Sequence, residues 1–244
     1  MDWIASTLFW YIHLFFIGII FMPFTKKLFP RFFDQGYAFS KTLGIICLTY
    51  ATFLLGVIKV VPFTQTSLYV LLALFAAANL YVYIKDKDKG TFLALPMSRQ
   101  IVFIFEEFLF LGAILLLAYI RGQEPSIHGL EKFMDFGFIN AALKATHFPP
   151  LDMWYSAGPD LHGVDNPNGF PINYYYFGHL SGAVLIKLSS IPAYIGYNLI
   201  LATIFAQGVT LAFSFVSNLI HLVQQNLSKK LLVPSVSTYL YGLL

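Results

Sequence analysis

Four uninterrupted apolar runs, each about as long as a membrane is thick, constrain this chain more than any other feature of its sequence. They cover residues 3–24, 42–61, 67–84 and 101–120. A helix needs about 20 apolar residues to cross the hydrocarbon core of a bilayer. Because backbone polar groups must be satisfied internally in lipid, segments of this kind are expected to be helical. The runs therefore predict four transmembrane helices.

The composition fits lipid as the solvent and excludes several soluble classes. Of the 244 residues, 58% are hydrophobic and 11% are charged, against about 25% charged residues in soluble domains. The formal net charge is +3, and eight of the 15 basic residues are divided between two loops rather than gathered in one patch, so we exclude nucleic-acid binding, which needs a basic face. The single cysteine, Cys47, lies inside an apolar run and rules out an internal disulfide. Phosphate-binding loops and zinc-protease motifs are missing from the sequence, which argues against a soluble nucleotide enzyme.

The basic residues predict how the helices are oriented. Four lie between the first and second runs and four between the third and fourth, whereas the link 62–66 carries no charge. Positively charged loops stay in the cytoplasm, so we expect the N-terminus outside. The segment 121–172 is then extracytoplasmic, and it holds six of the 12 acidic residues. Loops this long are usually functional, so we expect any chemistry there.

Two further apolar stretches, 173–188 and 193–223, leave the topology open. If both cross the membrane, Lys229 and Lys230 lie outside, against the positive-inside rule. If the first is re-entrant or interfacial, the two lysines lie inside.

We expect an all-α polytopic transmembrane bundle of about six membrane segments, with an extracytoplasmic loop that carries juxtamembrane helices. Residues 1–100 are predicted to form a three-helix region and residues 101–244 the start of a core domain. The sequence stops within an apolar run that has barely begun, so we expect it to be the N-terminal part of a longer protein.

Two carboxylates of the long loop are candidates for chemistry. Glu131 and Asp135 are four residues apart, within an amphipathic stretch at 130–145 that predicts an interfacial helix. On a helix they share one face and suit a base and an acid or a divalent-cation site. A solvated helix face explains the spacing equally well.

The turns that follow hold further candidates. Asp152 and Trp154 lie in a rigid aromatic turn at 148–155, which suits either a membrane anchor or a site. Asp160, His162 and Asp165 form a loose polar cluster, which is typical of a solvated loop, although His and Asp also ligate metals.

Three consecutive tyrosines precede the fifth apolar stretch. Tyr174, Tyr175 and Tyr176 suit a sugar ring or an aromatic belt at the membrane surface. His179 follows just inside the apolar stretch, where it is expected to be neutral or paired. Glu106 and Glu107 enter the fourth run near its cytoplasmic end and are functional candidates because ionisable groups are costly in a membrane.

In this order these motifs resemble the YYY integral membrane protein family, a domain of unknown function named for its Tyr-Tyr-Tyr-x-Gly motif. The resemblance covers residues 101–223 and rests on Glu106, Arg121, Pro125, and the segments 131–136, 148–154, 173–179 and 197–199.

That family is in turn similar to the GT-C glycosyltransferases, which carry an acidic residue on a juxtamembrane helix and a Pro-Pro-Leu element after it. The resemblance implies that Asp135 is the catalytic base and that the donor is a sugar on a polyprenyl phosphate. Glu131 is the candidate second acid, although in the GT-C enzymes the second acid adjoins the first and here it is four residues upstream. Arg121 or Lys132 would bind the lipid phosphate. In the GT-C enzymes the loop follows the first helix, whereas here it follows the fourth.

A list of substrate-binding residues follows from the motifs and the resemblance together: Arg121, Lys132, Asp152, Trp154, Tyr174, Tyr175, Tyr176 and His179. The expected partners are a polyprenyl-phosphate sugar and membrane lipid, in a multi-pass protein of the plasma membrane. The cofactor is left open between none and a divalent cation. Two rival interpretations are a transporter or flippase for a lipid-linked or small polar substrate, and a non-catalytic membrane assembly protein.

Overall fold

The computed structural model describes most of the chain, and the statements below concern the residues that it describes: 3–86, 95–155, 158–159, 163, 165–166 and 169–227. Two members of the predicted polar cluster, Asp160 and His162, lie outside these residues, as do Lys229 and Lys230.

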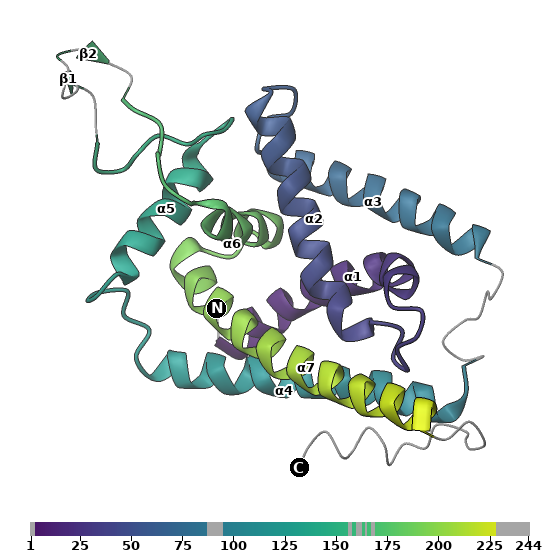
Figure 1. The fold of residues 1–244 in the computed structure, drawn as a ribbon. Helices are drawn as coiled ribbons and strands as arrows, with labels where there is room; N and C mark the ends of the chain where they lie inside the picture. Colours follow the sequence, from purple (N-terminus) through teal and green to yellow (C-terminus); the bar gives the residue numbers. More distant parts are fainter. Residues whose placement is uncertain are drawn as a thin grey trace. The chain divides into compact units, whose positions relative to one another are not determined.

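The described chain is built from α-helices with one minimal hairpin, as drawn in Figure 1. The helices are α1 (Trp3–Leu28), α2 (Tyr37–Val57), α3 (Gln65–Lys85), α4 (Met97–Gln123), α5 (Lys132–Lys144), α6 (Phe177–Ser189) and α7 (Ala193–Leu227). Between α5 and α6, β1 (Gly158–Pro159) pairs antiparallel with β2 (Asp165–Asn166). The predicted all-α polytopic fold class is confirmed.

Five of the described helices, α1, α2, α3, α4 and α7, are long and apolar enough to cross a membrane. The sixth helix, α6, has only 13 residues, which makes it about 20 Å long, whereas the hydrocarbon core is about 30 Å thick. Of the six or so membrane segments expected, five described helices are therefore long enough to span. Among the described residues α7 is then the one candidate crossing after the loop, which corresponds to the alternative with a re-entrant or interfacial 173–188 stretch.

The chain divides into two compact units, and the first comprises residues 1–44, 74–123 and 201–244. Here α1 and α4 pack side by side and run in opposite directions, since Trp3 contacts Tyr119 (ring centroids 5.8 Å) and Tyr11 contacts Phe110 (6.3 Å). The indole Nε1 of Trp10 donates a hydrogen bond to Thr203 Oγ1 on α7 at 2.9 Å. This unit is a bundle of membrane helices held together by buried polar as well as apolar groups.

The second unit comprises residues 45–73 and 124–200 and contains α5 and α6, which pack closely against one another (Figure 1). Lys187 of α6 connects the α2–α3 link with α5. The Lys187 Nζ donates hydrogen bonds to the carbonyl oxygens of Phe63 (2.8 Å) and Leu143 (3.0 Å). At the end of α2 the lack of a side chain on Gly56 admits the ring of Phe148, since a Cβ there would lie 2.4 Å from ring atom Cδ2. The α5–α6 layer is thereby fixed to the α2–α3 link.

Two other segments of the long loop are joined by an isolated antiparallel β-bridge between Leu151 and Pro171. Asp152 N donates to Phe170 O at 2.8 Å, and Ile172 N donates to Pro150 O at 2.9 Å. This pairing brings the Pro-Pro-Leu-Asp turn next to the segment that leads into the tyrosines.

Candidate functional site

The first turn of α5 presents the carboxylate that the sequence singled out. The helix begins at Lys132 with Glu131 as its N-cap, and Asp135 N donates to Glu131 O at 3.0 Å, so the two acids are one turn apart. The Glu131 side chain makes no capping bond and is exposed. An acid in the first turn is stabilised by the helix dipole by about 0.3–1 kcal/mol.

The carboxylate of Asp135 is paired with a histidine from the first turn of α6. His179 Nε2 lies 3.1 Å from Asp135 Oδ1. The other ring nitrogen, Nδ1, is buried and has no hydrogen-bond partner among the described residues. A proton on Nδ1 would be buried without an acceptor, so we place the ring proton on Nε2, which donates to Asp135.

This arrangement decides which member of the pair can reach a substrate. The Asp135 side chain is 41% exposed, against 18% for His179. Because Nδ1 is buried and Nε2 is hydrogen-bonded to the Asp135 carboxylate, neither nitrogen of His179 is available to an incoming molecule. Asp135 retains an oxygen beyond the one that His179 contacts, so Asp135 is the accessible group and His179 orients it.

An aromatic wall adjoins the Asp135–His179 pair. Phe138, one turn after Asp135, contacts the rings of His179 (5.2 Å), Trp154 (6.0 Å) and Tyr174 (5.4 Å, nearly parallel). Sequence reasoning missed Phe138, although its spacing of three from Asp135 places both residues on one face of α5.

Two of the three tyrosines extend this wall into solvent. The rings of Tyr174 and Tyr175 stack with centroids 3.9 Å apart, and the Tyr174 hydroxyl donates to the Tyr175 hydroxyl at 2.5 Å. This bond is the main cause that raises the pKa of the Tyr174 phenol, and the charges of Glu131 and Asp135 add to it. Both acids are thus within electrostatic range of the exposed tyrosines.

Other predicted site residues have different surroundings. Tyr176 turns away and packs on Phe53 of α2 (6.2 Å), and burial raises the pKa of its phenol. Asp152 Oδ1 accepts hydrogen bonds from the backbone N–H groups of Trp154 (2.8 Å) and Tyr155 (2.9 Å), so it shapes the turn that presents Trp154. Lys132 is the first residue of α5, beside Glu131. Arg121 lies in the last turn of α4, in the first unit, and is not among the residues that the second unit gathers.

A hollow of about 720 Å³ lies between α5 and the turn that follows it. Its polar lining comprises Asn140, Lys144, Thr146, His147 and Asp152. Sequence reasoning did not single out Lys144 or His147. Both are ordinary loop and helix-end residues in the sequence. They line the same hollow only because the turn folds back onto α5.

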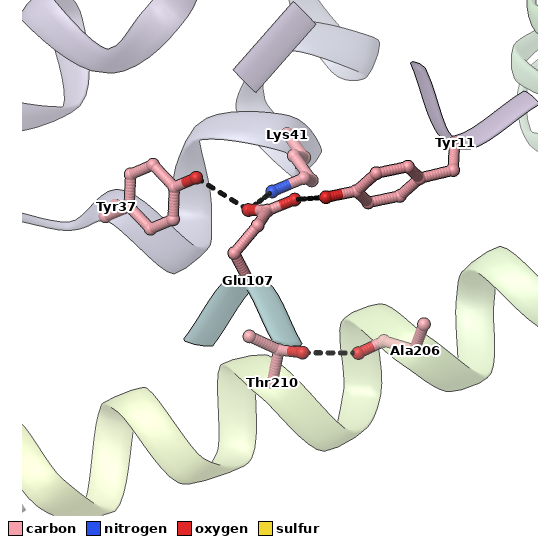
Figure 2. A network of polar contacts seen from close by, with 6 residues as sticks. All are labelled: Tyr11, Tyr37, Lys41, Glu107, Ala206 and Thr210. Carbon is pink, nitrogen blue, oxygen red and sulfur yellow. Dashed lines mark hydrogen bonds and ion pairs between the residues drawn. The ribbon is translucent and has the colours of Figure 1, made fainter. Parts of the chain in front are cut away.

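The first unit contains a separate buried charged cluster around Glu107 of α4. The Glu107 carboxylate accepts hydrogen bonds from Lys41 Nζ (2.5 Å) and from the hydroxyls of Tyr11 (2.5 Å) and Tyr37 (2.6 Å), as drawn in Figure 2. Lys41 is almost wholly enclosed, with 4% of its side chain exposed. A buried charge needs such a partner, because an isolated one is very costly. The cluster therefore neutralises Glu107 within the bundle.

The neighbouring Glu106 is fully buried, and it lies beside the side chains of Asp34, Lys41 and Ser214. Asp34 is itself fully buried and accepts hydrogen bonds from Ser214 Oγ (2.5 Å) and Asn218 Nδ2 (2.9 Å) on α7. Sequence reasoning identified Glu106 and Glu107 but not Asp34, which lies in a loop in the sequence.

Metal-ligating side chains are sparse in the part of the chain that the structure describes, where no group of three His, Cys, Asp or Glu is arranged to hold an ion.

The fold and its apolar helices define a multi-pass α-helical membrane protein. A family model described as Uncharacterized membrane protein (DUF2298) matches residues 47–244, and the chain belongs to this family. The match includes every predicted site residue and begins well before residue 101, while the predicted domain boundary at residue 100 stays a prediction. Neither the curated proteins nor the solved structures include a significant match.

Proposed function

We propose that this protein is a membrane glycosyltransferase of GT-C type, which transfers a sugar from a polyprenyl phosphate to an acceptor outside the cytoplasm. The observation that supports it best is the exposed carboxylate of Asp135, oriented by His179 and bordered by the aromatic wall of Phe138, Tyr174 and Trp154. A base beside aromatic faces is an arrangement suited to carbohydrate chemistry.

In the proposed reaction the leaving group is already activated. Asp135 takes the proton of the acceptor hydroxyl while the acceptor oxygen bonds to the anomeric carbon. The bond from that carbon to the lipid phosphate oxygen breaks, and polyprenyl phosphate leaves with the electron pair. The enzyme must mainly align the acceptor and remove its proton. The hydrogen bond from His179 fixes the carboxylate without consuming its second oxygen.

The surrounding residues are assigned supporting roles. Tyr174, Tyr175 and Trp154 hold the sugar or the first prenyl units against their ring faces. Lys132 binds the lipid phosphate, and Glu131 supports the charge of the site as a second acid. Arg121, which belongs to the first unit, is given no role in this proposal. A plasma-membrane location is part of the proposal, because it exposes the loop to the acceptor.

The proposal is tested with the full-length protein in liposomes and a panel of radiolabelled polyprenyl-phosphate sugars. Wild type should transfer label, Asp135→Asn should lose roughly 10²–10⁴-fold in rate, and His179→Gln should lose less. Glu124→Gln is the matched control, since it removes an exposed acid of the same loop outside the cluster. Equal transfer by wild type and Asp135→Asn would remove Asp135 from the reaction.

A transporter or flippase is the second candidate, and the buried acids of the first unit favour it. Glu106 and Asp34 are both fully buried in a membrane bundle, where ionisable residues usually mark a proton or ion pathway. Movement of a lipid-linked sugar across vesicles without covalent change, lost in Glu106→Gln and kept in Asp135→Asn, would favour this function. A loss of partner binding in Trp154→Ala with neither activity detectable would favour the assembly protein.

A further inference from the structure

A cavity of about 1240 Å³ in the first unit is lined by residues of α1, α4 and the end of α3. The proposed reaction does not use it. Its apolar wall includes Phe15, Ile19, Met22, Phe103 and Ile104. Its polar residues include Lys26, Lys27, Arg99 and Asp86.

The cavity has a basic end at Lys26, Lys27 and Arg99, and the rest of its lining is mostly apolar apart from Glu107. Because α1 and α4 run in opposite directions, the end of α1 with Lys26 and Lys27 lies at the level of the start of α4 with Arg99. This is the end that the basic loops predict to be cytoplasmic. Along α1 the lining runs from Phe15 to Lys27, which is about 18 Å at 1.5 Å per residue. One leaflet of the hydrocarbon core is about 15 Å thick, so the cavity is as long as one acyl chain layer.

The charges of the lining leave a net attraction for an anion. Lys26 is paired with Asp86 at 2.7 Å. Glu107, the second acid of the lining, is neutralised by Lys41 and two phenols. Lys27 is exposed, and the guanidinium of Arg99 is held over the ring of Phe33 with 5.5 Å to its centroid. Lys27 and Arg99 are therefore the two cations that are not balanced by an acid among the described residues of the lining.

We propose that this cavity binds an anionic phospholipid of the cytoplasmic leaflet. The phosphate lies between Lys27 and Arg99, and one acyl chain follows the wall past Ile19 and Ile104 toward Phe15. Basic pockets between membrane helices on the cytoplasmic side are suited to anionic head groups. The site is distinct from the Asp135 pair, which belongs to the other unit.

The test is native mass spectrometry of the full-length protein released from nanodiscs that contain phosphatidylglycerol and phosphatidylcholine in equal amounts. Wild type should retain phosphatidylglycerol selectively. The double variant Lys27→Gln/Arg99→Gln should lose roughly 30-fold in affinity, at about fivefold per charge. Lys85→Gln is the matched control, because this exposed lysine at the end of α3 is not part of the lining. It should retain the lipid as wild type does.

A second variant separates the chain from the head group. Ile104→Trp fills the apolar wall and keeps every charge, so it should also displace the lipid. Equal retention of both lipids by wild type, or no loss in the double variant, would overturn the site. If inorganic phosphate displaces phosphatidylglycerol as well as a lipid does, the cavity is a phosphate site without a lipid. If polyprenyl phosphate binds much more tightly than phosphatidylglycerol, the substrate lipid occupies the cavity. Either result would overturn the phospholipid assignment.

Discussion

Replacing Lys187 by methionine should destabilise the second unit by about 3 kcal/mol. The ammonium group donates to the carbonyls of Phe63 and Leu143 and lies 4.1 Å from the centroid of the Phe63 ring. Hydrogen bonds to a charged group contribute about 1.5–3 kcal/mol each, and the cation–π contact adds about 0.5–1 kcal/mol. The lower values add to about 3.5 kcal/mol, and we reduce this to about 3 kcal/mol because the side chain is only partly buried. Methionine keeps the aliphatic stem, so the loss reports the ammonium contacts.

The assay is thermal unfolding of the full-length protein in detergent. At about 2–4 °C per kcal/mol for a chain of this size, the midpoint should fall by roughly 6–12 °C. Lys144→Met, at the exposed end of α5, should change it by little. A midpoint within 2 °C of wild type, about 1 kcal/mol or less, would refute the role assigned to Lys187.

The same side chain predicts a dependence on pH. Burial lowers the pKa of Lys187 from its ordinary value of 10.5. The unfolded chain therefore holds more protons than the folded chain between the lowered pKa and 10.5, so stability rises with pH across that interval. The neutral amine keeps two N–H groups for the two carbonyls. Lys187→Met should lack this rise, and a rise of equal size in the variant would assign it to another group.

Two further substitutions test the packing of each unit. Gly56→Ala should destabilise by about 1–2 kcal/mol, because crowding against the ring of Phe148 costs about 1–3 kcal/mol and outweighs a helix-propensity gain of up to about 1 kcal/mol. Gly112→Ala on α4 meets nothing within 4 Å and should instead stabilise, so equal shifts in thermal unfolding would contradict the packing argument. Lys41→Met should cost about 3–5 kcal/mol by leaving Glu107 buried without its cation. The double variant with Glu107→Gln should recover most of that loss, and no recovery would show that the pair is not the cause.

The positions of the membrane helices follow from the sequence because each crossing needs its own apolar run. The helix ends differ by a few residues, since α1 continues through Lys26 and Lys27 to Leu28. The 173–188 stretch could not be resolved by hydropathy, because Tyr174 and its neighbours are apolar enough to extend the run but lie before the helix. Only the start of α6 at Phe177 makes it too short to span.

The candidate site was predictable in its residues but not in its contacts. Asp135 and His179 were both singled out, yet they are 44 residues apart, and their pairing depends on how α5 packs on α6. Tyr176 looked equivalent to the two tyrosines before it, and the start of α6 turns it toward Phe53 instead. Asp34 meets α7 across 180 residues, a distance at which a single sequence carries no pairing signal.

The most direct test of the proposed chemistry is the rate of the first turnover when donor is already bound to the full-length protein. We expect Asp135→Asn to bind the polyprenyl-phosphate sugar as wild type does and to transfer it at least about 100-fold more slowly. The acceptor proton would then lack its base while the aromatic wall is unchanged. An unchanged rate, or a slow rate explained entirely by lost donor binding, would contradict the role of Asp135 as the base.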